Sequence, residues 1–188
     1  MDFVILVFGL LIGSFLNVCI YRIPRGESVV FPGSRCPYCG TRLKPADLVP
    51  VFSFLFLKGK CRYCGQPISW QYPLVEALTA CLIWLFYRCY GMTLMWAYYA
   101  FIGCILIAVS FIDLSHQEIP NGLVLTLMVA GLVAKLAGIG AGIMDGLYGL
   151  LTGGTPLALI ALVSLVVIRK EGMGGGDIKL MAAVGWCL

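Results

Sequence analysis

Charged residues are scarce in this sequence of 188 residues, where Asp, Glu, Lys and Arg together make up 12%. Soluble globular proteins carry about twice that share. Hydrophobic residues supply 61% of the chain, which is the composition of a membrane protein rather than of a soluble domain. The chain length therefore tells how many membrane-spanning helices the protein can form, and not how many soluble domains it has.

Several chemistries lack the residues that they need. No GxxxxGK[ST] loop is present, so the sequence does not indicate an NTPase. His116 is the only histidine, and only Ser110 and Ser115 lie close to it in the sequence, which gives a serine protease little support. No small-residue cleavage site follows the first apolar segment, so we interpret that segment as a retained helix rather than a signal peptide. We expect no nucleic-acid partner.

Long apolar segments predict an all-α polytopic transmembrane helical bundle. A helix needs about 20 apolar residues to cross the hydrocarbon core of a bilayer. A last apolar run starts at Ile178 and stops at Leu188, which suggests a truncated chain. One segment contains Thr152-Gly-Gly-Thr-Pro156, where we expect a kink or a break. The five segments long enough to span are residues 3–21, 74–90, 92–112, 119–136 and 142–168.

Basic residues are concentrated between the first two apolar segments. Eight of the thirteen Lys and Arg residues lie there, opposed only by Glu27 and Asp47. The positive-inside rule places this loop in the cytoplasm and the N-terminus outside, and alternation brings residues 113 and 169–179 to the cytoplasmic face as well. The same charges favour membrane lipids with acidic headgroups as partners. The eight residues are Arg22, Arg25, Arg35, Arg42, Lys44, Lys58, Lys60 and Arg62.

Two cysteine pairs repeat within this loop, as Cys36-Pro-Tyr-Cys39-Gly and Cys61-Arg-Tyr-Cys64-Gly. Two CxxC pairs at this distance are typical of a structural four-cysteine Zn²⁺ site. Two disulfides or a thiol redox motif are the alternatives. A cytoplasmic loop disfavours stable disulfides, and no strand-helix-strand pattern surrounds the cysteines. The other five cysteines lie in or beside apolar segments, where we expect small buried hydrophobes.

The apolar segment 47–57 between the cysteine pairs is only about half a span long. We expect it to lie along the membrane surface and to hold the zinc loop there. The chain then divides into a first transmembrane helix (1–22), a cytoplasmic zinc-binding loop (23–72) and a transmembrane domain (73–188).

Asp113 and Asp177 stand apart from the other acidic residues. Asp113 follows a long apolar run, at the end of a helix whose dipole disfavours a negative charge. Asp177 follows Gly172-Met-Gly-Gly-Gly176 and opens the last apolar run, and a helix N-cap is the alternative interpretation there. The glycines allow strained backbone angles and a close approach of a substrate chain or a second helix. Glu76 suits the start of its helix, and Asp145 lies near a helix end. The other acids lie in tails, loops or a turn, where we expect solvated side chains: Asp2, Glu27, Asp47, Glu118 and Glu171.

Two carboxylates at one membrane face are the arrangement of an aspartic protease, in which like-charge repulsion keeps one of them protonated. A non-enzymatic, zinc-stabilised membrane scaffold is the alternative, but it leaves the position of Asp113 unexplained. A methyltransferase without peptidase activity is a second alternative.

The chain resembles the bacterial type IV prepilin peptidases. Gly174-Gly-Gly176-Asp177 matches the GxGD motif of that family. The resemblance continues through residues 13–24, the paired CxxC hairpins, residues 73–76 and residues 111–121, in the order of the family, and covers nearly the whole chain.

This resemblance implies an aspartic endopeptidase of the inner membrane that removes the basic leader from prepilins or pseudopilins on the cytoplasmic side. It also implies N-methylation of the new N-terminus with S-adenosylmethionine. Asp113 and Asp177 would be the catalytic pair, and Cys36, Cys39, Cys61 and Cys64 the zinc ligands.

Overall fold

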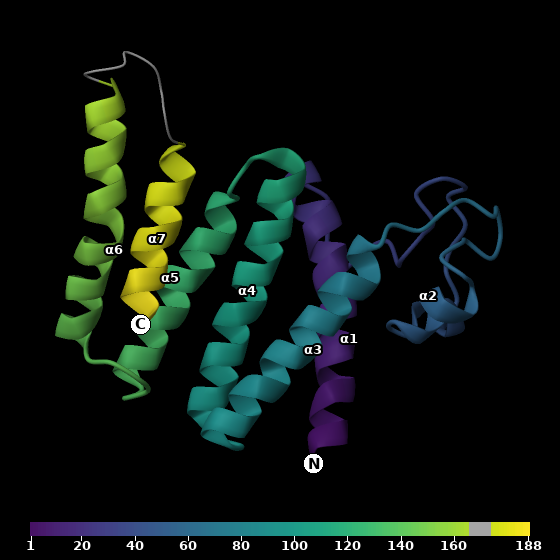
Figure 1. Ribbon diagram of the computed structural model, residues 1–188, viewed down its shortest axis with the longest axis horizontal. Coiled ribbons are helices and arrows are strands. Elements are labelled where there is room, and N and C mark those ends of the chain that lie inside the picture. The colour runs from purple at the N-terminus through teal and green to yellow at the C-terminus, as the bar shows by residue number, and fades with distance from the viewer. Residues whose placement is uncertain (166–173) are drawn as a thin grey trace. The chain divides into compact units, whose positions relative to one another are not determined.

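The computed structural model describes residues 1–165 and 174–188, and these residues form helices joined by loops (Figure 1). Within the described residues no β-strand forms, and the predicted all-α fold is confirmed. The helices are α1 (Asp2–Arg22), α2 (Phe52–Phe56), α3 (Gln71–Tyr90), α4 (Leu94–His116), α5 (Asn121–Leu136), α6 (Ile143–Val163) and α7 (Gly175–Cys187), with two short 3-10 helices, η1 (Ile23–Arg25) and η2 (Pro45–Leu48).

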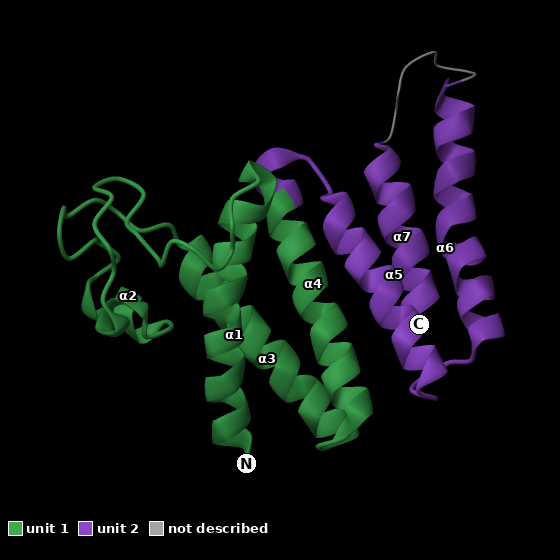
Figure 2. Ribbon diagram, turned by 180° about the vertical axis from the view of Figure 1, so that it is seen from behind, with its two compact units in different colours: residues 1–112 green, residues 113–188 purple. Residues whose placement is uncertain are grey.

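The chain forms two compact units, residues 1–112 and residues 113–188 (Figure 2). The first unit holds α1, the cysteine loop, α3 and most of α4. The second unit begins at Asp113 in the last turn of α4 and contains α5, α6 and α7. The division into 1–22, 23–72 and 73–188 stays a prediction.

Three of the described helices are long and apolar enough to cross a membrane: Asp2–Arg25, Leu94–His116 and Ile143–Val163. Residues 119–136, predicted to span, form the shorter apolar helix α5 of 16 residues. Residues 74–90 lie in α3, which carries the charged residues Glu76 and Arg88. The number of spans and the side on which the N-terminus lies stay predictions.

Glycines bring α1 and α3 into close contact in the first unit. A Cβ atom at Gly9 would lie 2.6 Å from Ala80 Cα, and one at Gly13 would lie 2.6 Å from Glu76 Cα. The amide of Asn17 on α1 donates a hydrogen bond of 3.0 Å to the Tyr72 carbonyl at the start of α3. Small residues at such interfaces allow helices in a membrane to pack backbone against backbone.

In the second unit, α7 packs against both α5 and α6. The backbones of Gly149 on α6 and Gly185 on α7 touch, because a Cβ atom on either would overlap the carbonyl oxygen of the other. The indole of Trp186 donates a hydrogen bond of 3.0 Å to the Met128 carbonyl on α5. The helix that begins at Gly175 is therefore held on two sides.

We expected a kink or a break at residues 152–156. A break is wrong, because α6 continues as a helix through Pro156, and a kink stays a prediction. Gly153 and Gly154, which we interpreted as helix breakers, instead face Met181 and Ala182 of α7. Proline inside a helix lacks one backbone hydrogen bond, and the close packing of these glycines against α7 stabilises the helix beside it.

Candidate active site and metal centre

The two cysteine pairs form two hairpins of the same geometry. In the first, the Cys36 N–H donates to the Thr41 carbonyl (3.0 Å) and the Gly40 N–H to the Cys36 carbonyl (2.9 Å). In the second, the Cys61 N–H donates to the Gln66 carbonyl (2.8 Å) and the Gly65 N–H to the Cys61 carbonyl (2.9 Å). Both glycines have left-handed φ angles, of 69° and 71°. Glycine is therefore required after each CxxC pair, because other residues rarely adopt this conformation.

These hairpins bring together the four predicted zinc ligands. The Sγ atoms of Cys36, Cys39, Cys61 and Cys64 all lie within 4.8 Å of one another, and those of Cys36 and Cys64 are 3.8 Å apart. Four sulfurs bound at about 2.3 Å to one tetrahedral Zn²⁺ would be separated by about 3.8 Å. The cluster thus fits a structural zinc ion with little movement.

The thiols of the cluster differ in acidity. Hydrogen bonds from the side chain and backbone of Thr41 lower the pKa of Cys39 to about 6. A hydrogen bond from the Gln66 backbone lowers the pKa of Cys64, but burial and the three neighbouring cysteines outweigh it and raise that pKa to about 12. Four sulfurs this close cannot all become thiolates unless a cation balances their charge. A zinc ion supplies that charge and releases the remaining protons.

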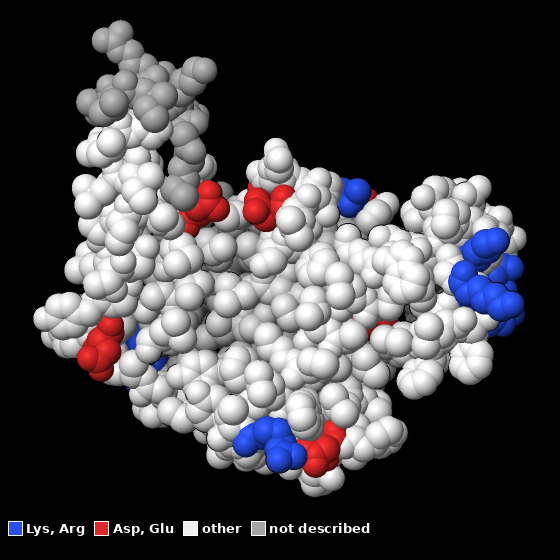
Figure 3. All heavy atoms as spheres, in the orientation of Figure 1, with Lys and Arg blue, Asp and Glu red and all other residues white. Residues whose placement is uncertain are grey.

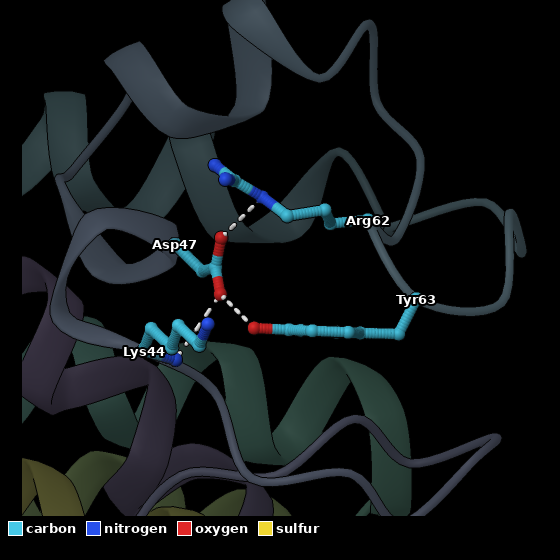
Figure 4. Close-up of polar contacts among 4 residues, drawn as sticks. All are labelled: Lys44, Asp47, Arg62 and Tyr63. Atoms are coloured by element: carbon cyan, nitrogen blue, oxygen red, sulfur yellow. Dashed lines mark hydrogen bonds and ion pairs between the residues drawn. The ribbon is translucent and has the colours of Figure 1, made fainter.

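Asp47 joins the segment between the hairpins to the second hairpin (Figure 4). One carboxylate oxygen lies 2.8 Å from Arg62 Nε. The other accepts hydrogen bonds from the Tyr63 hydroxyl (2.9 Å) and from the Lys44 N–H (3.1 Å). Desolvation alone would raise the pKa of Asp47, but the Lys44 N–H, Tyr63 and Arg62 together lower it.

Asp47 was therefore wrongly interpreted as a solvated loop acid. Its side chain is only 4% exposed. Two features of the sequence point to this role. Asp47 is one of only two acids among eight basic residues of the loop, and it stands three residues after Lys44, which is the spacing of a helix cap.

Glu76 joins the same loop to the helices of the first unit. It is buried on α3, against Gly13 of α1, and its carboxylate accepts a hydrogen bond of 2.7 Å from the Val51 N–H. The sequence predicted only a favourable interaction of Glu76 with the helix dipole. The residue instead connects α1, α3 and the segment that leads into α2.

Asp113 lies in the last turn of α4, as predicted, and is exposed. The Gln117 N–H donates a hydrogen bond of 2.7 Å to its backbone carbonyl, and Gln117 has a left-handed φ angle of 54°. The chain then turns through Ile119 and Pro120 into α5.

Asp177 lies in the first turn of α7 and is partly buried. Gly174 is the N-cap residue of this helix, so the alternative interpretation of Asp177 as the N-cap is wrong. Gly174 has a φ angle of −67°, and neither Gly175 nor Gly176 has a positive φ, so the expected strained angles are absent at these three glycines. Gly172 and Met173 lie outside the described residues.

The segment that follows Asp113 meets the helix that carries Asp177. A Cβ atom at Gly176 would lie 3.2 Å from Ile119 Cβ, so the turn before α5 lies close to this glycine. The approach of a substrate chain or a second helix at these glycines stays a prediction. Lys179 Nζ donates a hydrogen bond of 3.4 Å to Asn121 Oδ1 at the start of α5. The turn into α5 and the start of α5 thus contact the start of α7, and all three belong to the same unit as the end of α4.

Basic residues gather at one place on the surface. Figure 3 shows Lys and Arg gathered over the loop that carries α2. The exposed basic residues of this loop are Arg25, Arg35, Arg42, Lys44, Lys58, Lys60 and Arg62.

Comparison with known proteins gives two family matches that together cover most of the chain. Residues 7–90 match the model of the bacterial peptidase A24 N-terminal domain, and residues 100–188 match that of the type IV leader peptidase family. No solved structure is significantly similar to the chain.

Several similar proteins carry the name prepilin leader peptidase/N-methyltransferase. The protein of that name from Bacillus subtilis (strain 168) is 39% identical, over 98% of this chain and 73% of its own length. The one from Pseudomonas aeruginosa is 36% identical, over 96% of this chain and 70% of its own length. The one from Neisseria gonorrhoeae is 37% identical, over 95% of this chain and 71% of its own length.

Proposed function

The chain belongs to the type IV leader peptidase family, and we propose that it cleaves prepilins or pseudopilins with Asp113 and Asp177 as its catalytic pair. The observation that carries the proposal is the contact between Gly176 and Ile119. This contact joins the start of the helix that bears Asp177 to the turn that follows Asp113. We infer that the two carboxylates face the same substrate at the cytoplasmic side of the inner membrane.

Two aspartates of this kind divide the work of peptide hydrolysis. Like-charge repulsion keeps one carboxyl protonated while the other is ionised. The ionised carboxylate takes a proton from a bound water molecule, and the resulting hydroxide attacks the scissile carbonyl carbon. The protonated carboxyl donates a hydrogen bond to the carbonyl oxygen, and a proton then passes to the leaving amine. We assign neither role to one residue alone.

The position of the pair suits the proposed substrate. A prepilin presents a short basic leader followed by an apolar helix. Asp113 closes α4, which is long and apolar enough to cross the membrane. A site at the end of a spanning helix lies where a substrate leaves the bilayer for water, which is where the junction between leader and apolar helix would stand.

The four-cysteine cluster fits zinc as a structural ion, because all four positions around the metal are filled by sulfur and none is open to substrate. Cys36, Cys39, Cys61 and Cys64 would hold the ion, and zinc would stabilise the fold of the loop. The loop is joined to the helices through the hydrogen bond between Val51 and Glu76.

The relatives' name includes N-methyltransferase, so methylation of the new N-terminus with S-adenosylmethionine is part of the proposal. Among the described residues, Asn17 Oδ1 is the one buried side-chain acceptor that has neither a hydrogen bond nor an ion pair. One such atom does not make a site for a molecule of this size. We therefore assign no residue to this cofactor.

Cleavage of a purified prepilin in detergent tests the catalytic pair. Asp113→Asn and Asp177→Asn should each abolish cleavage while the zinc content stays at one ion per chain. Asp145→Asn is the matched control, because Asp145 caps the start of α6, at the end of that helix away from the proposed pair, and the variant should cleave at close to the parental rate. Parental cleavage by either of the first two variants would remove that residue from the mechanism.

A further inference from the structure

The short helix α2 between the two zinc hairpins presents an apolar face that the rest of the chain does not cover. Phe52, Leu55 and Phe56 are 54%, 60% and 84% exposed. Residues separated by three and four positions lie on one side of a helix, so these three side chains form one face. We define the three as the α2 face.

The opposite side of α2 is anchored to its own unit. Phe54 is buried, and its ring centroid lies 4.8 Å from that of Trp70. A Cβ atom at Gly59 would lie 3.2 Å from the same ring. The exposure of the α2 face is therefore not a consequence of a loose helix. A helix that is fixed on one side and apolar on the other needs an apolar environment on its open side.

Contacts within the first unit determine where α2 lies along the length of α1, and therefore how deep it lies in the membrane. The Val51 N–H at the start of α2 is hydrogen-bonded to Glu76, and Glu76 lies against Gly13 of α1. Gly13 precedes the end of α1 at Arg22 by nine residues, which is about 13 Å along the helix. Because α1 is long and apolar enough to span, the start of α2 is held beside the span rather than beyond its basic end.

The charges around α2 complement a lipid surface. The exposed residues Lys58 and Lys60 follow directly after the α2 face. Long basic side chains extend from an apolar depth to the level of the headgroups, where anionic phosphates attract them. An apolar helix face with basic residues beside it is the pattern of a helix that lies about 5–10 Å deep at the boundary between headgroups and acyl chains.

We propose that the α2 face inserts into the acyl boundary of an anionic lipid leaflet and anchors the zinc loop in the membrane. The occupant of the face is lipid, not a second protein. The anchor sets the depth of the loop relative to α1 and α3. This proposal is independent of the two aspartates and concerns a surface, not a reaction.

Photo-crosslinking of the full chain in nanodiscs of phosphatidylethanolamine and phosphatidylglycerol tests the proposal. Phe56→p-benzoylphenylalanine should form lipid adducts, detected by mass spectrometry, at several times the yield of Tyr38→p-benzoylphenylalanine. Tyr38 is a suitable control because it is 66% exposed and belongs to the first zinc hairpin. Equal yields at the two positions, or crosslinks from position 56 to a second protein chain, would overturn the proposal.

A second measurement needs no crosslinker. Phe52→Ser with Phe56→Ser should raise the rate of tryptic cleavage after Lys58 in the same nanodiscs by roughly tenfold or more, because the anchored loop opens more often. Val30→Ser with Phe31→Ser removes two exposed apolar side chains of the same loop outside the α2 face and should leave that rate unchanged. An unchanged rate in the first variant, or an equal rise in both, contradicts the proposal. Neither readout depends on peptidase activity, so failure here leaves the catalytic proposal untouched.

Discussion

A single added methyl group at Gly149 tests how α7 is held. The backbones of Gly149 and Gly185 touch, and a Cβ atom on Gly149 would overlap the Gly185 carbonyl oxygen. No side-chain rotamer relieves that overlap, because both partners are backbone. Gly149→Ala must therefore move α6 away from α7 along the contact that also includes Gly153 and Met181.

The magnitude follows from two opposing terms. Overpacking by one methyl group in a close interface costs about 1–3 kcal/mol. Alanine also favours a helix over glycine by about 0.5–1 kcal/mol. We expect Gly149→Ala to lower the free energy of unfolding by about 1–2 kcal/mol. Gly122→Ala is the matched control, because a Cβ atom at Gly122 meets nothing within 4 Å, and this variant should be neutral or slightly more stable.

Cys187 on α7 provides a local assay. The residue is 2% exposed, and its thiol donates a hydrogen bond to the Leu127 carbonyl. Alkylation of Cys187 by N-ethylmaleimide, followed by mass spectrometry of its peptide, should be about 5–30 times faster in Gly149→Ala than in the parent. The rate in Gly122→Ala should not rise. If the two variants react at the same rate as the parent, the α6–α7 contact is not as close as we describe.

Three further predictions concern the zinc loop. Cys36→Ser and Cys61→Ser should each lose the zinc ion, measured by metal analysis, and trypsin should then cleave after Lys58 and Lys60 faster; retained zinc would exclude these cysteines as ligands. Glu76→Ala removes the acceptor of the Val51 hydrogen bond, lowers the stability of the loop by about 1–3 kcal/mol and should speed tryptic cleavage at the same sites. Glu76→Gln keeps an acceptor and should restore most of the resistance to trypsin. The pKa of Asp47 is lower in the folded protein than its unfolded value of about 3.9. The ionised carboxylate therefore stabilises the loop fully above the unfolded pKa, and this stabilisation is lost as the pH falls through the folded pKa. Asp47→Asn should cause the same loss at neutral pH, measured by tryptic cleavage after Arg62, and equal cleavage of variant and parent would contradict this role.

Local patterns in the sequence predicted the helices and the cluster of four cysteines well. The first apolar run, residues 3–21, forms the helix Asp2–Arg22. Four cysteines in two short hairpins form one cluster. Each hairpin is closed by local hydrogen bonds, which join residues four, five and nine positions apart. Features of this kind depend on neighbours in the chain and are visible in the sequence.

Contacts between distant segments were not predictable in the same way. Nothing in the sequence pairs Val51 with Glu76, because a single hydrogen bond leaves no periodic pattern. The excess of basic residues around Asp47 predicts an ion pair there but does not identify Arg62 as the partner. The expected break at Pro156 was wrong for a related reason. Proline and glycine weaken an isolated helix, but close packing of the same glycines against α7 keeps α6 helical.

The measurement that tests the central claim most directly is a double-mutant cycle on prepilin cleavage. The cycle compares the parent, Asp113→Asn, Asp177→Asn and the double variant, with zinc content and Cys187 alkylation as controls for folding. If the two aspartates act as one catalytic unit, each single substitution lowers kcat by at least about 10³-fold, and the double variant is no slower than either single variant. If either single variant keeps the parental rate, or if the two losses multiply in the double variant, the aspartates do not work as a pair.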